Sequence, residues 1–442
     1  MTTIEQRDEV ATAPASPAPA PPPPPSRRDV PAPGVPPLTA DVRIFLAVIF
    51  MLPVQIQTGG LSRLAPADAL LGLLVLLSPG VVRFRSKLVD LLPLALVATL
   101  AYGTLLALVR AGDATNHTLL VKLAGSLLLG LLAVVTATYA RAGHALRTIK
   151  VLIVGMSFWG LVAYIDYKVV DILPFVAAKT SSRFGGMQYD PNNAGAAYAV
   201  TLIVGAVVGR RAFAHRGWWA TCMAISAAAL ALTLSRGGYV ALVGASVVVL
   251  LVQRPTMQRS IRAVAIGVLV ALVAVASGVV GSAIDDFANR PDTVTGREDL
   301  AENGIRLFVE SRGLGIGLGT YRATFDEHII HNTALWLVVE MSLVGLALYV
   351  LMVSVPAVAA LRIRRHDRVL GAALLGGHVA MVIASAGIEA LYQRQWWVIV
   401  GLVAGVGALG ERASPTTPSI GGRASGLSAP ARSTLPPPTP AR

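Results

Sequence analysis

Long apolar tracts alternate with short polar connections along almost the whole chain. The tracts fall at about 43–57, 66–81, 88–109, 118–140, 148–167, 191–209, 218–235, 237–252, 263–284, 332–360, 369–388 and 395–410. Most of them can cross a hydrocarbon core of ~30 Å, which needs about 20 helical residues. They are continuous and lack a two-residue alternation, which favours helices over the strands of a membrane barrel. The pattern therefore predicts an all-α polytopic membrane protein with about twelve transmembrane helices.

The two ends of the chain have a different composition. Residues 1–40 are rich in Pro and Ala, and residues 412–442 repeat that bias. Such segments bury little apolar surface, so we predict two disordered cytoplasmic tails around one helical bundle at 41–411. Either a solvated tail or a partner-binding segment is compatible with this composition. We find no convincing internal repeat, which disfavours an inverted-repeat transporter.

Composition supports a membrane location. Only 14% of the residues are charged and 54% are hydrophobic, whereas soluble proteins have roughly 25% charged residues. The net charge of +13 would suggest nucleic acid in a soluble protein. Here the cations gather in short loops, so we expect them to set orientation in the membrane and expect no nucleic-acid partner.

The basic loops alternate in register with the predicted helices. If the N-terminus is cytoplasmic, the inside loops are 82–87, 141–150, 210–217, 253–262 and 361–368, and each holds three or four Lys or Arg residues. Their one acid is Asp367. This agrees with the positive-inside rule and predicts that both termini are cytoplasmic. One wrongly assigned helix would have broken the alternation.

Two of the predicted outer connections carry unusual sequences. The segment 168–190 ends in an Arg-Phe-Gly-Gly motif that begins at Arg183. The segment 285–331 is the longest connection and is predicted to be a large extracytoplasmic loop. We expect it to contain a short amphipathic helix that begins near Thr295, with a capping box formed by Thr295 and Glu298. The apolar side of this helix would carry Leu300, Ile305, Leu307 and Phe308.

Several side chains on the predicted outer face could carry chemistry. Arg236 lies between two apolar tracts and is followed by two glycines, so it is either a phosphate clamp or an arginine that reaches for the interface. Arg297 and Arg183 are either ligands for an anion or solvated residues. His331 is either a residue at a helix start or a general base beside an anionic substrate.

Metal and nucleotide chemistry are not favoured by the motifs. The chain has no Asp-x-Asp, no His-x-x-x-His on a helix and one cysteine, Cys222. We therefore expect no metal and no cofactor. The glycines at 315, 317 and 319 mimic a nucleotide loop, but no strand is predicted before them, so we expect no nucleotide site there.

Four segments taken in order resemble one family. They are Arg183 to Asn192, Leu-Thr-Leu-Ser-Arg-Gly-Gly at 232–238, the stretch 296–321 with its repeated glycines, and His-Asn-Thr-Ala-Leu-Trp from His331. Their order and common sidedness are similar to the O-antigen ligase and polymerase superfamily of bacterial membrane glycosyltransferases. The resemblance covers about residues 180–350, and the ending around Arg394 is compatible with it.

The resemblance implies a metal-independent enzyme that acts at the outer face of the inner membrane. Arg236 and Arg297 would bind the pyrophosphate of a polyprenyl-linked glycan donor, and His331 would activate a hydroxyl of a glycan or glycolipid acceptor. Arg183, Asn192 and Arg394 would bind substrate. His328 could compete with His331 for the role of base.

Alternatives to a ligase remain open from the sequence. A polymerase of the same superfamily differs only in its acceptor. A lipid-linked-glycan transporter or flippase would favour charges deep in several helices and repeat symmetry. A non-catalytic scaffold of an envelope assembly would make the outer arginines dispensable. The sequence names neither the sugar nor the acceptor.

Overall fold

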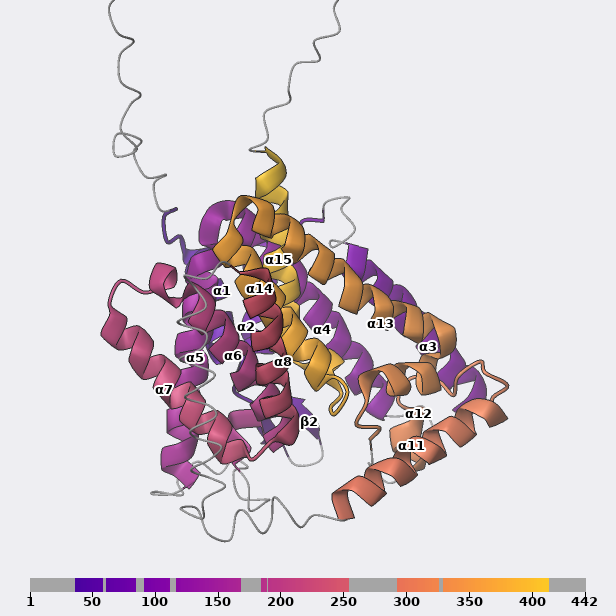
Figure 1. The fold of residues 1–442 in the computed structure, drawn as a ribbon. Coiled ribbons are helices and arrows are strands. Elements are labelled where there is room, and N and C mark those ends of the chain that lie inside the picture. The colour runs from indigo at the N-terminus through magenta and orange to yellow at the C-terminus, as the bar shows by residue number, and fades with distance from the viewer. Residues whose placement is uncertain are drawn as a thin grey trace, which may run out of the picture. The chain divides into compact units, whose positions relative to one another are not determined.

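A computed structural model describes residues 36–58, 61–84, 91–111, 117–167, 184–188, 190–253, 292–325 and 329–412. Helices dominate these residues (Figure 1). The α-helices are α1 Ala40–Met51, α2 Pro66–Leu77, α3 Leu92–Ala111, α4 His117–Tyr139, α5 Ala145–Ile165, α6 Pro191–Ala212, α7 Arg216–Thr233, α8 Arg236–Val252, α11 Asp292–Glu310, α12 Thr320–Thr324, α13 Thr333–His366, α14 Arg368–Ala384 and α15 Arg394–Arg412. Shorter elements are β1 Ile56–Thr58, β2 Leu61–Leu64, a π turn at Ala140–His144, and 3-10 turns at Pro79–Val81, Gly186–Gln188 and Ala390–Tyr392.

Each predicted apolar tract that the structure describes contains a helix, although the tract at 43–57 extends beyond α1 into β1. Within the part of the chain that the structure describes, four stretches are long and apolar enough to cross a membrane: Leu92–Arg110, Leu119–Ile165, Pro191–Ala212 and Thr333–His366. The second of these joins α4 and α5 through the π turn, where Gly143 has a φ of 91°. The chain is therefore a multi-pass membrane protein. The tract at 263–284 lies outside the described residues, and the count of twelve stays a prediction.

One local prediction was wrong, and one short element was not predicted. The fold is all-α apart from a small antiparallel hairpin, in which β1 pairs with β2 between α1 and α2. Helix α11 begins at Asp292, so Thr295 lies inside its first turn and is not the N-cap residue of a capping box. The apolar side of α11 packs against the core through Leu300, Leu307 and Phe308, whereas Ile305 is 51% exposed.

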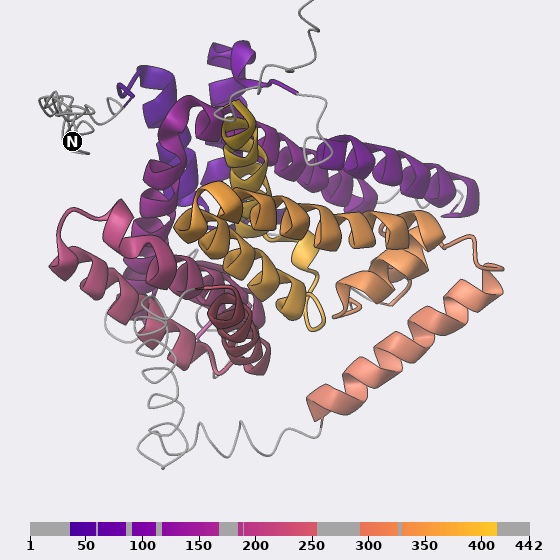
Figure 2. The ribbon, with the colours of Figure 1, turned by 45° about the horizontal axis from the view of Figure 1, so that its top comes forward.

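Four helices, α6, α8, α13 and α14, pack together as one group. Helix α14 contacts α6, α8 and α13, and α6 also contacts α8 (Figures 1 and 2). Glycines permit the α6–α8 approach, because a Cβ atom on Gly238 would lie 2.9 Å from the backbone of Gly195. The second glycine after Arg236 therefore has a steric reason. Helix α15 packs along α4 and completes the interior.

These four helices have two ends with different chemistry. At the end that we call the site end, the Ser235 hydroxyl before α8 donates to Asn192 at the start of α6, and Thr333 at the start of α13 bonds to the segment that follows α14. At the opposite end, Arg211 of α6 bonds to Asp367 between α13 and α14. The predicted inner loops 210–217 and 361–368 thus share one end. Which end faces the cytoplasm stays a prediction.

Candidate active site

Helix starts bring two of the predicted residues together. Asp190 caps α6, and its Oδ1 accepts from the backbone N–H of Asn192 at 2.7 Å. Ser235 caps α8 by accepting from the N–H of Gly238 at 3.1 Å, and its hydroxyl donates to Asn192 Oδ1 at 3.3 Å. Arg236 is the exposed first residue of α8. Asn192 and Arg236 therefore lie at one junction of two positive helix ends, which suits an anion.

His331 lies partly buried just before α13. Burial, and then the Arg297 cation, lower its pKa below the ordinary value of 6.5, while Asp190 and Glu389 oppose that shift. Burial has a larger effect on this pKa than the arginine. These interactions place residues of α6, α11 and the segment after α14 within electrostatic reach of His331.

Thr333 fixes the segment that carries Glu389. Its hydroxyl donates to the carbonyl of Ile388 at 2.7 Å and accepts from the N–H of Ala390 at 2.8 Å. Its own N–H donates to the carbonyl of Ser385 at 2.9 Å. Because Thr333 is two residues after His331, these three bonds hold Glu389 beside the candidate base.

A buried charge cluster lies next to this segment and was not predicted from the sequence. Lys122 Nζ is 3.5 Å from Glu340 Oε1 and 3.4 Å from Glu389 Oε1. The side chains of Lys122, Glu340 and Glu389 are only 6%, 0% and 14% exposed. Lys122 also lies over the Trp336 ring, 4.6 Å from its centroid. The sequence does hold a signal for this cluster. Lys122 and Glu340 lie inside predicted apolar tracts, and charges in such tracts need partners.

Tyr392 extends the cluster toward another arginine. Burial raises its pKa well above the ordinary value of 10.0, the carboxylates of Glu389 and Glu340 raise it further, and the Arg322 cation opposes them. Arg322 belongs to α12, which follows the glycine-rich segment. Two carboxylates, one lysine and Arg322 therefore gather around the start of α13.

The glycine-rich segment before α12 packs against α3 and α13 and bonds to Glu340 of this cluster. Gly315 and Gly317 have φ angles of 84° and 102°, and a Cβ atom on Gly317 would lie 2.4 Å from the backbone of Ala107 in α3. The N–H of Gly317 donates to the backbone carbonyl of Glu340 at 2.9 Å, and the N–H of Gly319 donates to Glu340 Oε2 at 2.9 Å. The glycines thus have a steric reason, namely close backbone approach to α3 and α13.

The break in α13 explains why this segment can bond to it. Ser342 has a φ of 57° inside the helix. The carbonyl of Val339 accepts from Ile316 at 3.0 Å, next to the bond between Glu340 and Gly317. Two carbonyl groups just before the break therefore receive donors from the loop.

The other residues predicted for the site are Arg394, Arg183 and His328. Arg394 opens α15 and forms a fork to Asp68 of α2, with Nε 3.0 Å from Oδ1 and Nη2 2.5 Å from Oδ2. A substrate anion would have to displace that carboxylate, so the role of Arg394 as a substrate ligand stays a prediction. Arg183 and His328 lie outside the described residues.

A search of the described residues for metal ligands finds no group of three or more His, Cys, Asp or Glu side chains that could hold an ion. Metal independence therefore stays a prediction, which a chelator can test.

One protein-family model matches part of the chain. Residues 221–350 match the family model described as O-antigen ligase. The matched stretch contains Arg236, Arg297 and His331, together with Glu340. No curated protein matches the chain.

The fold and the site together define the class of protein: it is a multi-pass membrane protein with a polar site at the ends of its helices. The family match confirms the resemblance stated above. The match at 221–350 supports a relationship to the O-antigen ligase and polymerase superfamily.

Proposed function

We propose that the protein is a metal-independent membrane glycosyltransferase that moves a glycan from a polyprenyl-pyrophosphate carrier to an acceptor hydroxyl. The observation that carries the proposal is the environment of His331. A candidate base is partly buried within reach of one cation, Arg297, and two carboxylates, Asp190 and Glu389. A histidine kept neutral near pH 7 beside a fixed cation suits proton removal next to an anionic donor.

In the proposed step, the acceptor oxygen attacks the anomeric carbon of the donor sugar. The bond between that carbon and the pyrophosphate oxygen breaks, and polyprenyl pyrophosphate leaves. The acceptor proton passes to His331. Arg236 and Arg297 stabilise the charge that grows on the leaving pyrophosphate, because planar guanidinium groups bind phosphate oxygens in pairs.

Glu389 has a supporting role in this proposal. Its carboxylate lies close enough to His331 to favour the protonated imidazole, and it also pairs with Lys122 at 3.4 Å. Lys122 and the Thr333 bonds keep Glu389 in place. We expect Glu389 to position and tune the base without touching the reacting atoms.

Two reactions are compatible with this proposal, and they differ only in the acceptor molecule. A ligase transfers the glycan to a different molecule, whereas a polymerase transfers it to another copy of the lipid-linked glycan. We place the reaction at the outer face of a bacterial inner membrane, because the basic loops predict that orientation.

Reconstitution tests the proposal directly. Purified protein in liposomes is supplied with lipid-linked oligosaccharide, with and without a second glycolipid acceptor, and the products are separated by size. We expect transfer that survives EDTA. A ladder of lengths would identify a polymerase, and one new band on the added acceptor would identify a ligase.

Two results would contradict the proposal. Loss of activity in EDTA that a divalent ion restores would contradict the arginine clamp. Movement of intact donor across the bilayer without any new glycosidic bond would favour the flippase alternative.

A further inference from the structure

The opposite end of the four-helix group contains a cavity that the proposed reaction does not use. It has a volume of about 880 Å³ and lies where α6, α8 and α13 end and α14 begins. Its lining includes Arg211, Arg364, Arg368 and Gln253. Helix ends of a membrane bundle lie at the level of lipid headgroups, so this cavity opens at that depth.

The cavity has an excess of positive charge. Its one acid, Asp367, is already engaged by Arg211, with Nη1 2.7 Å from Oδ1 and 2.9 Å from Oδ2. Asp367 also accepts from two N–H groups at the start of α14. Within the described ranges, Arg364 and Arg368 have no ion pair with a protein carboxylate.

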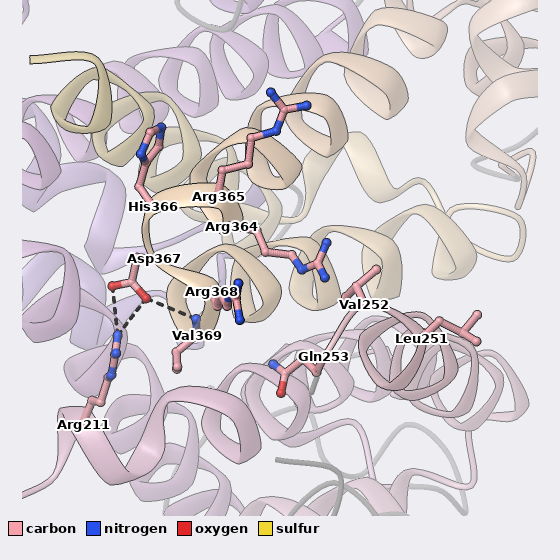
Figure 3. Close-up of a pocket in the computed structure, with 10 residues that line it drawn as sticks. All are labelled: Arg211, Leu251, Val252, Gln253, Arg364, Arg365, His366, Asp367, Arg368 and Val369. Atoms are coloured by element: carbon pink, nitrogen blue, oxygen red, sulfur yellow. Dashed lines mark hydrogen bonds and ion pairs between the residues drawn. The ribbon is translucent and has the colours of Figure 1, made fainter. Parts of the chain in front are cut away.

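The side chains converge on the space between the helix ends. In Figure 3 the guanidinium groups of Arg364 and Arg368 and the amide of Gln253 point into this space, whereas Arg365 and His366 point away from it. Both polar atoms of the Gln253 amide are buried and have no hydrogen-bond partner among the described residues. A buried amide with unused donors and acceptor costs free energy unless a ligand or water completes its bonds.

The positive-inside rule explains why arginines occur at this end, but not why two of them face a cavity together with an unused amide. We propose that the cavity binds a phosphate-bearing anion, and that its ligand is the headgroup of an anionic phospholipid. Arginine forks match phosphate oxygens, and the Gln253 amide adds a further donor. Leu251, 80% exposed at the rim, offers an apolar contact for the acyl chain.

Basic pockets between transmembrane helices on the cytoplasmic side are known to take anionic headgroups, which supports the choice of ligand. The inference does not rest on the proposed reaction, because the measured quantity is ligand binding and not glycan transfer. Loss of transfer activity would leave it standing.

Ligand-dependent stability of the full-length protein tests the proposal. Protein in a neutral detergent is titrated with short-chain phosphatidylglycerol, with short-chain phosphatidylcholine and with inorganic phosphate, and the midpoint of thermal unfolding is followed. We expect phosphatidylglycerol to raise the midpoint saturably, as a ligand specific to the folded state does. Phosphatidylcholine should have little effect.

Matched variants locate the site. Arg364→Gln combined with Arg368→Gln should weaken the apparent affinity for phosphatidylglycerol by about 10- to 30-fold, since each arginine near an anionic headgroup contributes appreciably. Arg362→Gln removes a charge from the same helix end outside the cavity lining and should leave the affinity nearly unchanged. Gln253→Leu keeps every arginine and should weaken binding severalfold. It also provides an independent variant if the double variant does not fold.

The outcomes separate the two sources of phosphate. If inorganic phosphate alone reproduces the shift with the same dependence on Arg364 and Arg368, the anion site stands and the ligand comes from solution. The absence of a saturable shift with either anion would overturn the proposal. Equal weakening by Arg362→Gln would also overturn it, because general surface charge would then explain the effect.

Discussion

The two ends of the same four helices treat charge in opposite ways. At the site end, Lys122 pairs with both Glu340 and Glu389, and these side chains are at most 14% exposed. At the opposite end, the Arg211–Asp367 pair is 49% and 38% exposed, and neighbouring arginines have no carboxylate partner within the described residues. A buried charge needs a partner within the protein itself. A charge at the interface can instead be paired by a ligand.

The largest effect should come from the candidate base. We expect His331→Ala to reduce transfer by about 10²- to 10⁴-fold, the usual contribution of a general base. Donor binding should persist, because Arg236 and Arg297 are expected to hold the pyrophosphate. Radiolabelled donor gives both the rate and the binding.

His328→Ala is the matched control for this experiment and should be mild, because only His331 is followed by Asn332 as in the family motif. If His328→Ala abolishes transfer and His331→Ala does not, the register of the motif match is wrong.

Breaking the buried cluster should destabilise the fold. Lys122→Ala leaves Glu340 and Glu389 without their cation, and the loss of one partner of a buried pair costs about 3–5 kcal/mol. The midpoint of thermal unfolding of the purified protein should fall clearly.

Two variants sharpen this result. Lys150→Ala removes an exposed lysine and should change the midpoint little. The pair Lys122→Met with Glu340→Gln should lose less than Lys122→Ala, because the charge of the lysine and that of the fully buried Glu340 disappear together. A Lys122→Ala protein that melts like the unaltered one would contradict the structural role of the cluster.

The geometry of Arg236 should matter as much as its charge. We expect Arg236→Lys to be nearly as damaging as Arg236→Ala, with a loss of roughly 10²- to 10³-fold in kcat, because lysine lacks the planar fork that binds two oxygens. The variant should insert normally, since Arg236 is exposed. Full activity in Arg236→Lys would reduce this residue to an orientation signal.

The pH profile should move in opposite directions for two variants. Transfer needs neutral His331, so the lowered pKa puts the ascending limb of kcat/KM below the ordinary value of 6.5. Arg297→Gln removes a cation that lowers this pKa, so the limb should move to higher pH. Glu389→Gln removes a carboxylate that raises it, so the limb should move to lower pH. Shifts in the same direction would mean that His331 is not the group that titrates.

The smallest effect should be found at the exposed pair. Arg211→Ala should change stability by about 0–1 kcal/mol, because exposed ion pairs contribute little. Asp367→Ala should cost more, about 0.5–2 kcal/mol, since Asp367 also caps α14. Equal losses at Arg211 and Lys122 would remove the contrast between the two ends.

Much of the site was predictable because its residues stand in a recognisable local sequence. The motifs around Asn192, Arg236 and His331 place these residues at helix starts, where capping residues and glycines mark the boundaries. The structure brings them to one end of the bundle, as the alternation of basic loops predicted. The start of α11 was missed because Thr295 and Glu298 imitate a cap that the helix does not use.

The sequence by itself determined the membrane class, the positions of the apolar helices and the order of the motifs, since all of these depend on residues close together in the chain. Only the tertiary structure decided which distant charges meet. Lys122 and Glu389 are 267 positions apart, and no local periodicity encodes their contact. The same holds for Arg394 and Asp68, 326 positions apart. Hydrophobic burial fixes where a helix lies, but the pairing of buried charges follows from how the helices pack, because each charge must find a partner in the space that packing leaves.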